Sequence, residues 1–243
     1  MRLRLTFAPI VAFTVACGPS DRATTTGGDT GGTLVIALPA EPGTLLPPLM
    51  VATTEKEIGD QLFDFLAEIG PNLNTLGDAG FTPRLAESWQ WGGDSLSIAF
   101  RLHPRARWHD GQPVTSHDVR FTVELMKDPK VGAHAAAAVA DVDSVSTPDS
   151  LTAVVWFARR SPEQFYNVAY NVVPVPVHLL RDADRANLAA HPFARSPVGS
   201  GPFRFVRWEA RTLVEVAADS AHYLARPLLD RVIWMLNPEI TAA

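Results

Sequence analysis

The feature that most constrains this fold lies between residues 81 and 129, where the sequence predicts a strand, a turn and a helix in succession. From Leu96 to Leu102, apolar residues alternate with small or polar ones, which predicts a strand with one buried face. Asp110-Gly111 predicts a turn, because glycine adopts a positive φ without a Cβ clash. The buried face of the strand implies that this segment contributes to a hydrophobic core.

A helix is expected between this turn and Pro129. Thr115 and Asp118 are three residues apart, as in a capping box, and apolar residues follow them at helical spacing. Pro129 ends the pattern, because proline has no backbone N–H and its ring clashes with the preceding turn.

This run resembles the first conserved block of the family 5 extracellular solute-binding proteins, the peptide/nickel group that feeds ABC importers. The family pattern reads approximately P-x-L-A-E-S-W, a strand, W-H-D-G-x-P-h-T-x-x-D-V-x-F-T, a helix, and D-P. The residues that match it are Pro83, Leu85 to Trp89, Trp108 to Gly111, Pro113, Thr115, Asp118, Val119, Phe121 and Thr122.

Further matches extend the resemblance over about residues 33 to 240. Leu62 to Leu66 fits L-F-D-x-L, and Val172 to Leu180 contains a phrase like hh-P-x-H-L-L. Ser196 to Phe203 is similar to P-V-G-T-G-P-Y, and the run from His222 to Ile233 is similar to x-Y-x-x-x-x-P-x-L-D-x-h. One departure is Leu46, which replaces the usual aspartate of the family's x-L-D-P loop.

The resemblance implies an α/β, periplasmic-binding-protein-like fold of type II, the dipeptide/oligopeptide-binding class. Members of the family are longer and have two lobes, so residues 33–243 are expected to form lobe I, incomplete, with lobe II absent from this chain. Pro238 to Thr241 would then be the point where the chain leaves for lobe II.

Residues 1–17 read as a lipoprotein signal peptide. Arg2 and Arg4 precede a short apolar run, which is too short to span a membrane, and Thr14 to Cys17 resembles a bacterial lipobox. Cys17 is therefore expected to be the lipidated N-terminus; the alternative is a secreted chain with an incidental cysteine. Residues 18–32 are rich in Gly, Ser, Thr and Asp and are expected to be a flexible tether.

Several further elements are expected from local patterns. Thr33 to Leu38 is continuously apolar, which predicts a strand buried on both faces. Thr54 and Glu57 suggest a capping box for a helix whose buried face includes Ile58, Leu62, Phe65, Leu66 and Ile69. Two more helices are expected, one at Ala133 to Ala140 and one that starts at Ser161-Pro162 and continues through Gln164 to Val168. Two hairpins are expected, one of Val139 to Thr147 with Leu151 to Phe157 and one of Phe203 to Trp208 with Leu213 to Ala217.

Composition excludes several classes of protein. The 243 residues are 47% hydrophobic and 19% charged, as in a soluble globular chain. The net charge is −5, and the charged residues form no long run of one sign, so the sequence shows no basic patch of the kind that binds nucleic acid. A single cysteine excludes an internal disulfide and a cysteine-based zinc site.

The candidate catalytic and metal-binding residues also have structural roles that fit their positions. The pairs His109-Asp110 and His117-Asp118 have ligand chemistry, but one lies in a turn and the other in the first turn of a helix. Ser200 lacks the flanking glycines of a nucleophile elbow, since Val198 and Pro202 occupy those positions. The tryptophans, Trp89 and Trp108 among them, are expected to pack in the core.

The resemblance implies a binding protein and not an enzyme, without a cofactor or a metal. It would capture a peptide or a related small solute outside the cytoplasmic membrane and deliver it to the transmembrane subunits of an ABC permease. The protein would be a monomer, lipid-anchored at the periplasmic or extracytoplasmic face of a bacterial membrane, with no nucleic-acid partner. The alternatives are a cell-envelope hydrolase and a nickel- or heme-scavenging member of the same family.

Ligand contacts are expected from two segments. Peptide-binding relatives place ligand-facing residues a few positions after the x-L-D-P loop, which implies Met50, Val51, Ala52 and Thr53 here, and just after the D-P of the central helix, which implies His134. Loops held by rigid elements are where binding residues concentrate, and methionine suits a tolerant pocket. The alternative is that these are ordinary surface residues.

Overall fold

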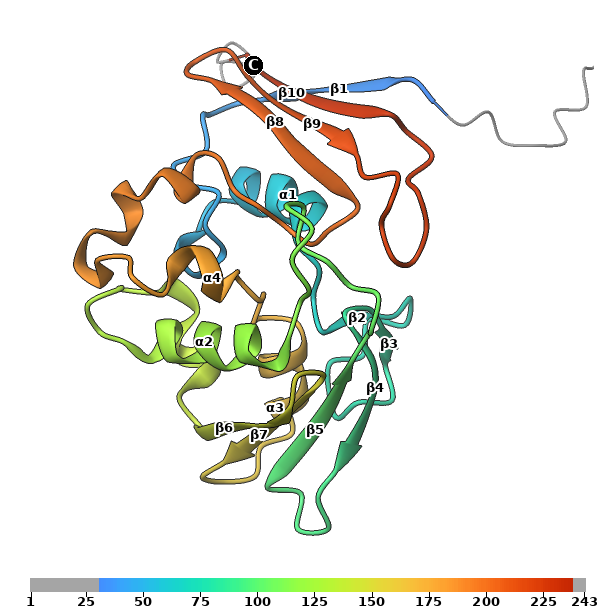
Figure 1. The fold of residues 1–243 in the computed structure, drawn as a ribbon, viewed down its shortest axis with the longest axis vertical. Coiled ribbons are helices and arrows are strands. Elements are labelled where there is room, and N and C mark those ends of the chain that lie inside the picture. The colour runs from blue at the N-terminus through green and yellow to red at the C-terminus, as the bar shows by residue number, and fades with distance from the viewer. Residues whose placement is uncertain (1–30, 238–243) are drawn as a thin grey trace, which may run out of the picture.

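The computed structural model describes residues 31–237, which form two four-stranded sheets with helices beside and between them (Figure 1). The first sheet has the order β1-β10-β9-β8, with bounds Thr33–Leu38, Arg231–Leu236, Leu213–Ala218 and Phe203–Glu209. The second has the order β4-β5-β7-β6, with bounds Ala86–Trp91, Ser97–Leu102, Thr152–Phe157 and Val142–Asp149. A short pair, β2 (Ala67–Ile69) and β3 (Phe81–Pro83), lies beside the second sheet.

The helices are mostly short. They are α1 (Thr53–Leu62), α2 (Ser116–Lys127), α3 (Gln164–Ala169), α4 (Val177–Leu180) and the 3₁₀ helices η1 (Pro47–Leu49), η2 (His134–Val139), η3 (Arg185–Ala190) and η4 (Pro192–Ala194). The predicted signal peptide with Cys17, most of the tether, and the segment Pro238 to Thr241 lie outside the described residues.

The strand, turn and helix predicted around α2 are confirmed. Ile98, Phe100 and Leu102 of β5 are fully buried. Gly111 has a φ of 91°, the left-handed conformation that the turn requires. Asp118 accepts hydrogen bonds from the Thr115 backbone N–H at 2.8 Å and from its hydroxyl at 3.0 Å, so the capping box forms and α2 packs its apolar face against β6 and β7.

The strand β1 forms as predicted, but the expectation that both its faces are buried is wrong. Leu34 is 44% exposed and Val35 is 55% exposed. β1 is an edge strand, paired only with β10, and α1 lies on the side of the sheet where Leu34 and Ile36 are found. Successive side chains alternate between the faces of a strand, so Val35 points to the side away from α1.

The helix α1 begins and ends earlier than predicted. Its N-cap is Ala52 instead of Thr54. The carboxylate at the start of the helix belongs to Glu55, which accepts hydrogen bonds from the backbone N–H groups of Val51 and Ala52 at 2.6 and 2.9 Å. The helix ends at Leu62, where the carbonyl accepts the N–H of Gly201 at 2.9 Å. The predicted helical residues Phe65, Leu66 and Ile69 therefore lie outside α1, the last of them in β2.

The later elements largely follow the sequence patterns. Both predicted hairpins form, as β6–β7 and β8–β9. The alanine-rich run is a 3₁₀ helix, η2, and α3 begins at Gln164, after Ser161-Pro162.

Tryptophan burial varies. Trp108 and Trp234 are almost completely buried, as expected of core residues. Trp89 is half-buried, packs against Phe165 with the two rings tilted by 54°, and donates from Nε1 to Asp78 at 2.8 Å. Trp156 is 43% exposed, so it does not belong to the core.

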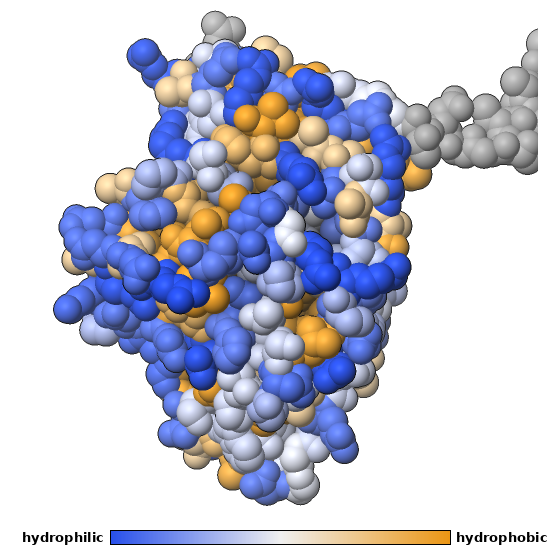
Figure 2. All heavy atoms as spheres, viewed as in Figure 1, coloured by the Kyte–Doolittle hydropathy of each residue, from blue (hydrophilic) through white to orange (hydrophobic). Residues whose placement is uncertain are grey.

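Apolar side chains also reach the surface. On the face shown in Figure 2 they gather in separate patches set among hydrophilic residues. Among residues 31–237, no helix combines the length and the apolar character needed to cross a bilayer.

Candidate ligand-binding site

The two segments predicted to contact ligand lie side by side. η1, which leads into the loop that carries Met50, packs against η2, which begins at His134. Met50 and Ala135 line one pocket of about 50 Å³, here called the Met50 pocket, together with residues of α1 and of the segment 170–173. The other four predicted residues do not line this pocket. They are Val51, Ala52, Thr53 and His134, which are exposed and adjacent in sequence to the lining residues Met50 and Ala135 or to one another.

A buried carboxylate fixes the loop that carries Met50. Glu55 is only 6% exposed, and its second oxygen accepts the backbone N–H groups of Gly43 and Thr44 at 2.8 and 3.3 Å. The same side chain thus joins both ends of the proline-rich loop to the start of α1. Four backbone donors on one carboxylate are a charge-assisted arrangement that holds the loop rigid.

Met50 rests on a glycine of α1. A Cβ at Gly59 would lie 2.8 Å from the Met50 Sδ, so a larger residue there would displace the methionine thioether. The thioether therefore forms one wall of the Met50 pocket, where its polarisable, unbranched chain adapts to apolar groups.

Two larger hollows adjoin the Met50 pocket. One, of about 540 Å³, is lined by Gln61, Phe65, Glu68, Arg84 and Tyr170 among others, and is called the Arg84 hollow here. The other, of about 350 Å³, lies between α1 and the apolar residues of β1, β8 and β10, and is called the sheet hollow. Asp60 of α1 lines all three spaces.

Most of the residues that build these walls were not predictable from the sequence. Lys56 and Asp60 lie on α1, and Tyr170 and Val173 follow α3, more than a hundred residues later. None of them belongs to a motif, and an acidic or basic residue on a helix is most often simply solvated. Their proximity comes from the packing of α1 beside the segment after α3, which no spacing in the sequence records.

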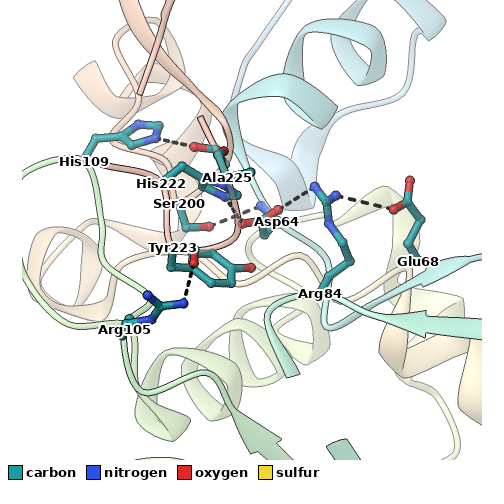
Figure 3. Close-up of polar contacts among 10 residues, drawn as sticks. Asp64, Glu68, Arg84, Arg105, His109, Ser200, His222, Tyr223 and Ala225 are labelled. Carbon is teal, nitrogen blue, oxygen red and sulfur yellow. Dashed lines mark hydrogen bonds and ion pairs between the residues drawn. The ribbon is translucent and has the colours of Figure 1, made fainter. Parts of the chain in front are cut away.

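The sequence motifs meet at a separate place, a junction between the two sheets (Figure 3). The imidazole of His109 donates to the carbonyl of Gly201 at 2.9 Å, and its other nitrogen accepts the N–H of Gly199 at 3.2 Å. A Cβ at Gly199 would lie 1.8 Å from the Leu62 carbonyl oxygen. The glycines are thus required by close backbone packing, and burial lowers the pKa of His109.

A buried carboxylate completes this junction. Asp64 is 0% exposed, and its two oxygens receive Arg84 Nη2 at 2.9 Å and His222 Nε2 at 3.0 Å (Figure 3). The hydroxyl of Ser200 accepts the Asp64 backbone N–H at 3.2 Å. These side chains link the segments that follow α1, β3 and β9, so the motifs stabilise the framework beside the pockets.

The carboxylates of the two His/Asp pairs both contact the start of α4, each in a structural role. Asp110 receives His178 Nε2 at 2.7 Å, whereas Asp118 caps α2 and also accepts the N–H of Val177 at 2.9 Å. Within residues 31–237, no three His, Cys, Asp or Glu side chains are grouped so that they could hold a metal ion.

Comparison with known proteins is consistent with this geometry. Residues 80–243 match the model described as bacterial extracellular solute-binding proteins, family 5 Middle. A putative ABC transporter peptide-binding protein of Brucella ovis is 35% identical over 150 residues, which cover 61% of this chain and 28% of that protein. The oligopeptide-binding protein AppA of Bacillus subtilis is 28% identical over 217 residues, which cover 88% of this chain and 38% of that protein.

Solved structures show the same fold. The structure of B. subtilis AppA in complex with a nonapeptide matches with a TM-score of 0.81 and 24% identity, over 89% of this chain and 42% of that one. AgaA of A. tumefaciens R10, in complex with agropinic acid, matches with a TM-score of 0.71 and 29% identity, over 85% of this chain and 40% of that one. The predicted α/β, periplasmic-binding-protein-like fold is confirmed, and the chain spans less than half the length of these relatives.

Proposed function

Because the chain belongs to the bacterial extracellular solute-binding proteins of family 5, we propose that it is the substrate-binding component of an ABC importer. It captures a peptide or a related small solute outside the cytoplasmic membrane and delivers it to the transmembrane subunits of the permease. The observation that carries this proposal is the meeting of η1 and η2 at the Met50 pocket, since both segments had been predicted to contact ligand. Relatives named as peptide-binding proteins favour a peptide as the solute.

In this proposal the described residues form part of a two-lobed protein, with residues 33–243 contributing lobe I. A second lobe closes over the pockets around α1 and buries the ligand, and the closed form is the one that the permease recognises. Ligand binding then shifts the population towards that closed form. The protein returns its ligand unchanged, and His109, Asp110, Asp118 and Ser200 serve the framework instead of catalysis.

The ligand-contacting residues of this lobe are proposed to be Met50, Val51, Ala52, Thr53 and His134. Met50 lines the pocket, and the exposed side chains beside it are free to meet a ligand held between two lobes. The loop is already rigid through Glu55, so binding costs little conformational entropy there.

The test uses the full-length polypeptide and an equimolar pool of pentapeptides, with retained peptides identified by mass spectrometry. Met50→Asp and His134→Ala are expected to lower retention, while the controls Met235→Asp and His117→Ala, both at exposed positions away from the pockets, retain the pool as the wild type does. Unchanged retention in both site variants removes these residues from the site. Tight binding by the 243-residue chain alone would overturn the two-lobe mechanism, and cleaved peptides would overturn the binding role.

The anchoring of the protein is a separate proposal. Cys17 becomes the lipidated N-terminus after removal of residues 1–16, and residues 18–32 tether a monomeric domain to the extracytoplasmic face of a membrane. Two or more acyl chains give stable attachment, whereas one chain gives only marginal binding. Labelled palmitate should appear on the wild type and be lost in Cys17→Ser; an unlabelled wild type in the soluble fraction contradicts the proposal.

A further inference from the structure

Asp60 is a carboxylate that faces the candidate site without a hydrogen-bond donor. It lies in the second half of α1, is half-buried, and lines the Met50 pocket, the Arg84 hollow and the sheet hollow. No described residue donates a hydrogen bond to it; its nearest opposite charge is Lys56, one helical turn earlier. Burial raises the pKa of Asp60, and Glu68 and Glu57 act in the same direction, whereas Lys56 opposes them.

An aromatic wall stands beside this carboxylate. Phe65 and Tyr170 line both the Met50 pocket and the Arg84 hollow, and their rings stack with centroids 4.5 Å apart and an interplanar angle of 14°. Tyr166 stacks on the same tyrosine, with centroids 5.6 Å apart. Together these rings offer π-electron faces next to a negative charge, which is the environment that attracts ammonium and guanidinium groups.

One ammonium group is already near this wall. The Nζ of Lys56 lies 5.9 Å from the centre of the Tyr170 ring. Lys56 is exposed and carries a long flexible side chain, so it can leave the ring face when another cation arrives. Its position shows that the wall accepts a positive charge.

The arginine beside the site does not neutralise the negative charge of Asp60. Arg84 lines its hollow, but its guanidinium is engaged by Asp64 at 2.9 Å and by Glu68 at 3.5 Å. Glu57 lines only the sheet hollow, which Phe65 and Tyr170 do not line. Two carboxylates, Asp60 and Glu68, therefore lie near the aromatic wall, and Asp60 is the one that has no guanidinium partner and accepts no hydrogen bond from a described residue.

We propose that Asp60, Tyr170 and Phe65 form a subsite for a cationic group of the bound solute, either an ammonium or a guanidinium. This inference rests on the proposed function and specifies its substrate class: solutes that carry a positive charge at this point of the site. The carboxylate receives hydrogen bonds from the cation, the tyrosine ring covers its face, and Lys56 occupies the place when the solute is absent.

The test compares full-length wild type, Asp60→Asn and Tyr170→Leu with the control Glu57→Gln, which removes a charge from the same helix outside the aromatic wall. Each protein is incubated with two equimolar pentapeptide pools, one with free and one with acetylated amino ends, and retained peptides are identified by mass spectrometry. The wild type should prefer charged over neutral peptides by about tenfold, the ratio that about 1.4 kcal/mol represents. The preference should be lost in Asp60→Asn and Tyr170→Leu and kept in Glu57→Gln.

The two pools identify the source of the charge. Enrichment of Lys- and Arg-containing peptides in both pools assigns the subsite to a side chain, whereas a preference that acetylation removes assigns it to the amino end. A wild type that retains peptides without regard to charge, or an Asp60→Asn variant that keeps the preference, overturns the inference and leaves the proposed function standing. Failure of the wild type to retain any peptide from either pool overturns both.

Discussion

The imidazole of His109 accepts a hydrogen bond from the backbone N–H of Gly199, which lies ninety positions further along the chain. Its opposite nitrogen donates to the Gly201 carbonyl, and the N–H of His109 itself donates to the Gly199 carbonyl at 2.8 Å. This arrangement requires a neutral imidazole with its proton on Nε2, because the Gly199 N–H needs an acceptor. Protonation of Nδ1 would break the link between the two motifs.

A pH dependence follows from that contact. Burial lowers the pKa of His109 from its ordinary value of 6.5, so below about pH 6.5 the unfolded chain takes up a proton that the folded chain does not. The free energy of unfolding should therefore decrease as the pH falls from 7.5 to 5.5, by at most about 1.4 kcal/mol per pH unit for this proton. Denaturant unfolding at each pH measures it, and His109→Gln should show a shallower slope.

His103 contributes in the same direction, since burial also lowers its pKa. His103→Gln is the matched control and should change the slope less, because the His103 imidazole accepts one local hydrogen bond, from the Arg105 backbone N–H, and its contact with the distant Tyr223 is a ring contact without a hydrogen bond. An identical slope in His109→Gln and wild type would contradict the assignment of the proton to His109.

Gly199→Ala should destabilise the protein strongly. The added Cβ would lie 1.8 Å from the Leu62 carbonyl oxygen, an atom of the backbone that cannot move aside without disturbing the end of α1. A loss of more than about 3 kcal/mol is expected from overpacking of this kind. Gly93→Ala is the control: no atom lies within 4 Å of its Cβ position, and its stability should stay within about 0.5 kcal/mol of wild type.

Arg84→Met should lower the free energy of unfolding, because it leaves the buried Asp64 carboxylate without its guanidinium partner. The arginine is 26% exposed and the aspartate 0%, so the pair is shielded on one side and the expected cost is about 3 kcal/mol, the lower end for breaking a buried pair. Arg101→Met removes a surface arginine whose partners are half-exposed and should cost less than about 1 kcal/mol. Equal losses in the two variants would mean that the Asp64 contact does not stabilise the junction.

Trp108→Ala should lower the melting temperature, because truncation of a tryptophan that is 1% exposed costs about 3–5 kcal/mol. Trp156→Ala, at 43% exposure, should cost much less. If Trp108→Ala leaves stability unchanged and abolishes peptide retention instead, Trp108 belongs to the ligand site.

Local rules predicted the segments whose neighbours are close in sequence. The capping box of Thr115 and Asp118 and the alternation before Leu102 need only a few consecutive residues, and both are confirmed. The start of α1 was misplaced by two residues, because Glu55 and Glu57 are both plausible capping residues, and only the folded loop around Gly43 selects the first. Burial of β1 was wrong because apolar composition does not record which strand lies at the edge of a sheet.

The candidate site was predictable only in part. Met50 and His134 came from a family pattern, and the structure brings their segments together. Asp60 and Tyr170 could not be found this way, since each is an unremarkable residue on its own element. Their role depends on a distance in space between α1 and the segment after α3, and a single sequence contains no signal for that distance.

The parallel pairing of β1 with β10 also sets an order of events during synthesis. Backbone partners in that pair are about two hundred positions apart. Just before the two strands, the backbone N–H of Asp230 donates to the carbonyl of Gly32, 198 positions earlier, at 3.0 Å. Strands β4 to β7, by contrast, pair with neighbours within one continuous stretch of chain. Contacts between distant residues form slowly, because a long loop must close before they are gained. We therefore expect the second sheet to collapse while the N-terminal strand is still unpaired, so that β1, with its exposed Val35, is open to aggregation or chaperone capture until β10 has been made.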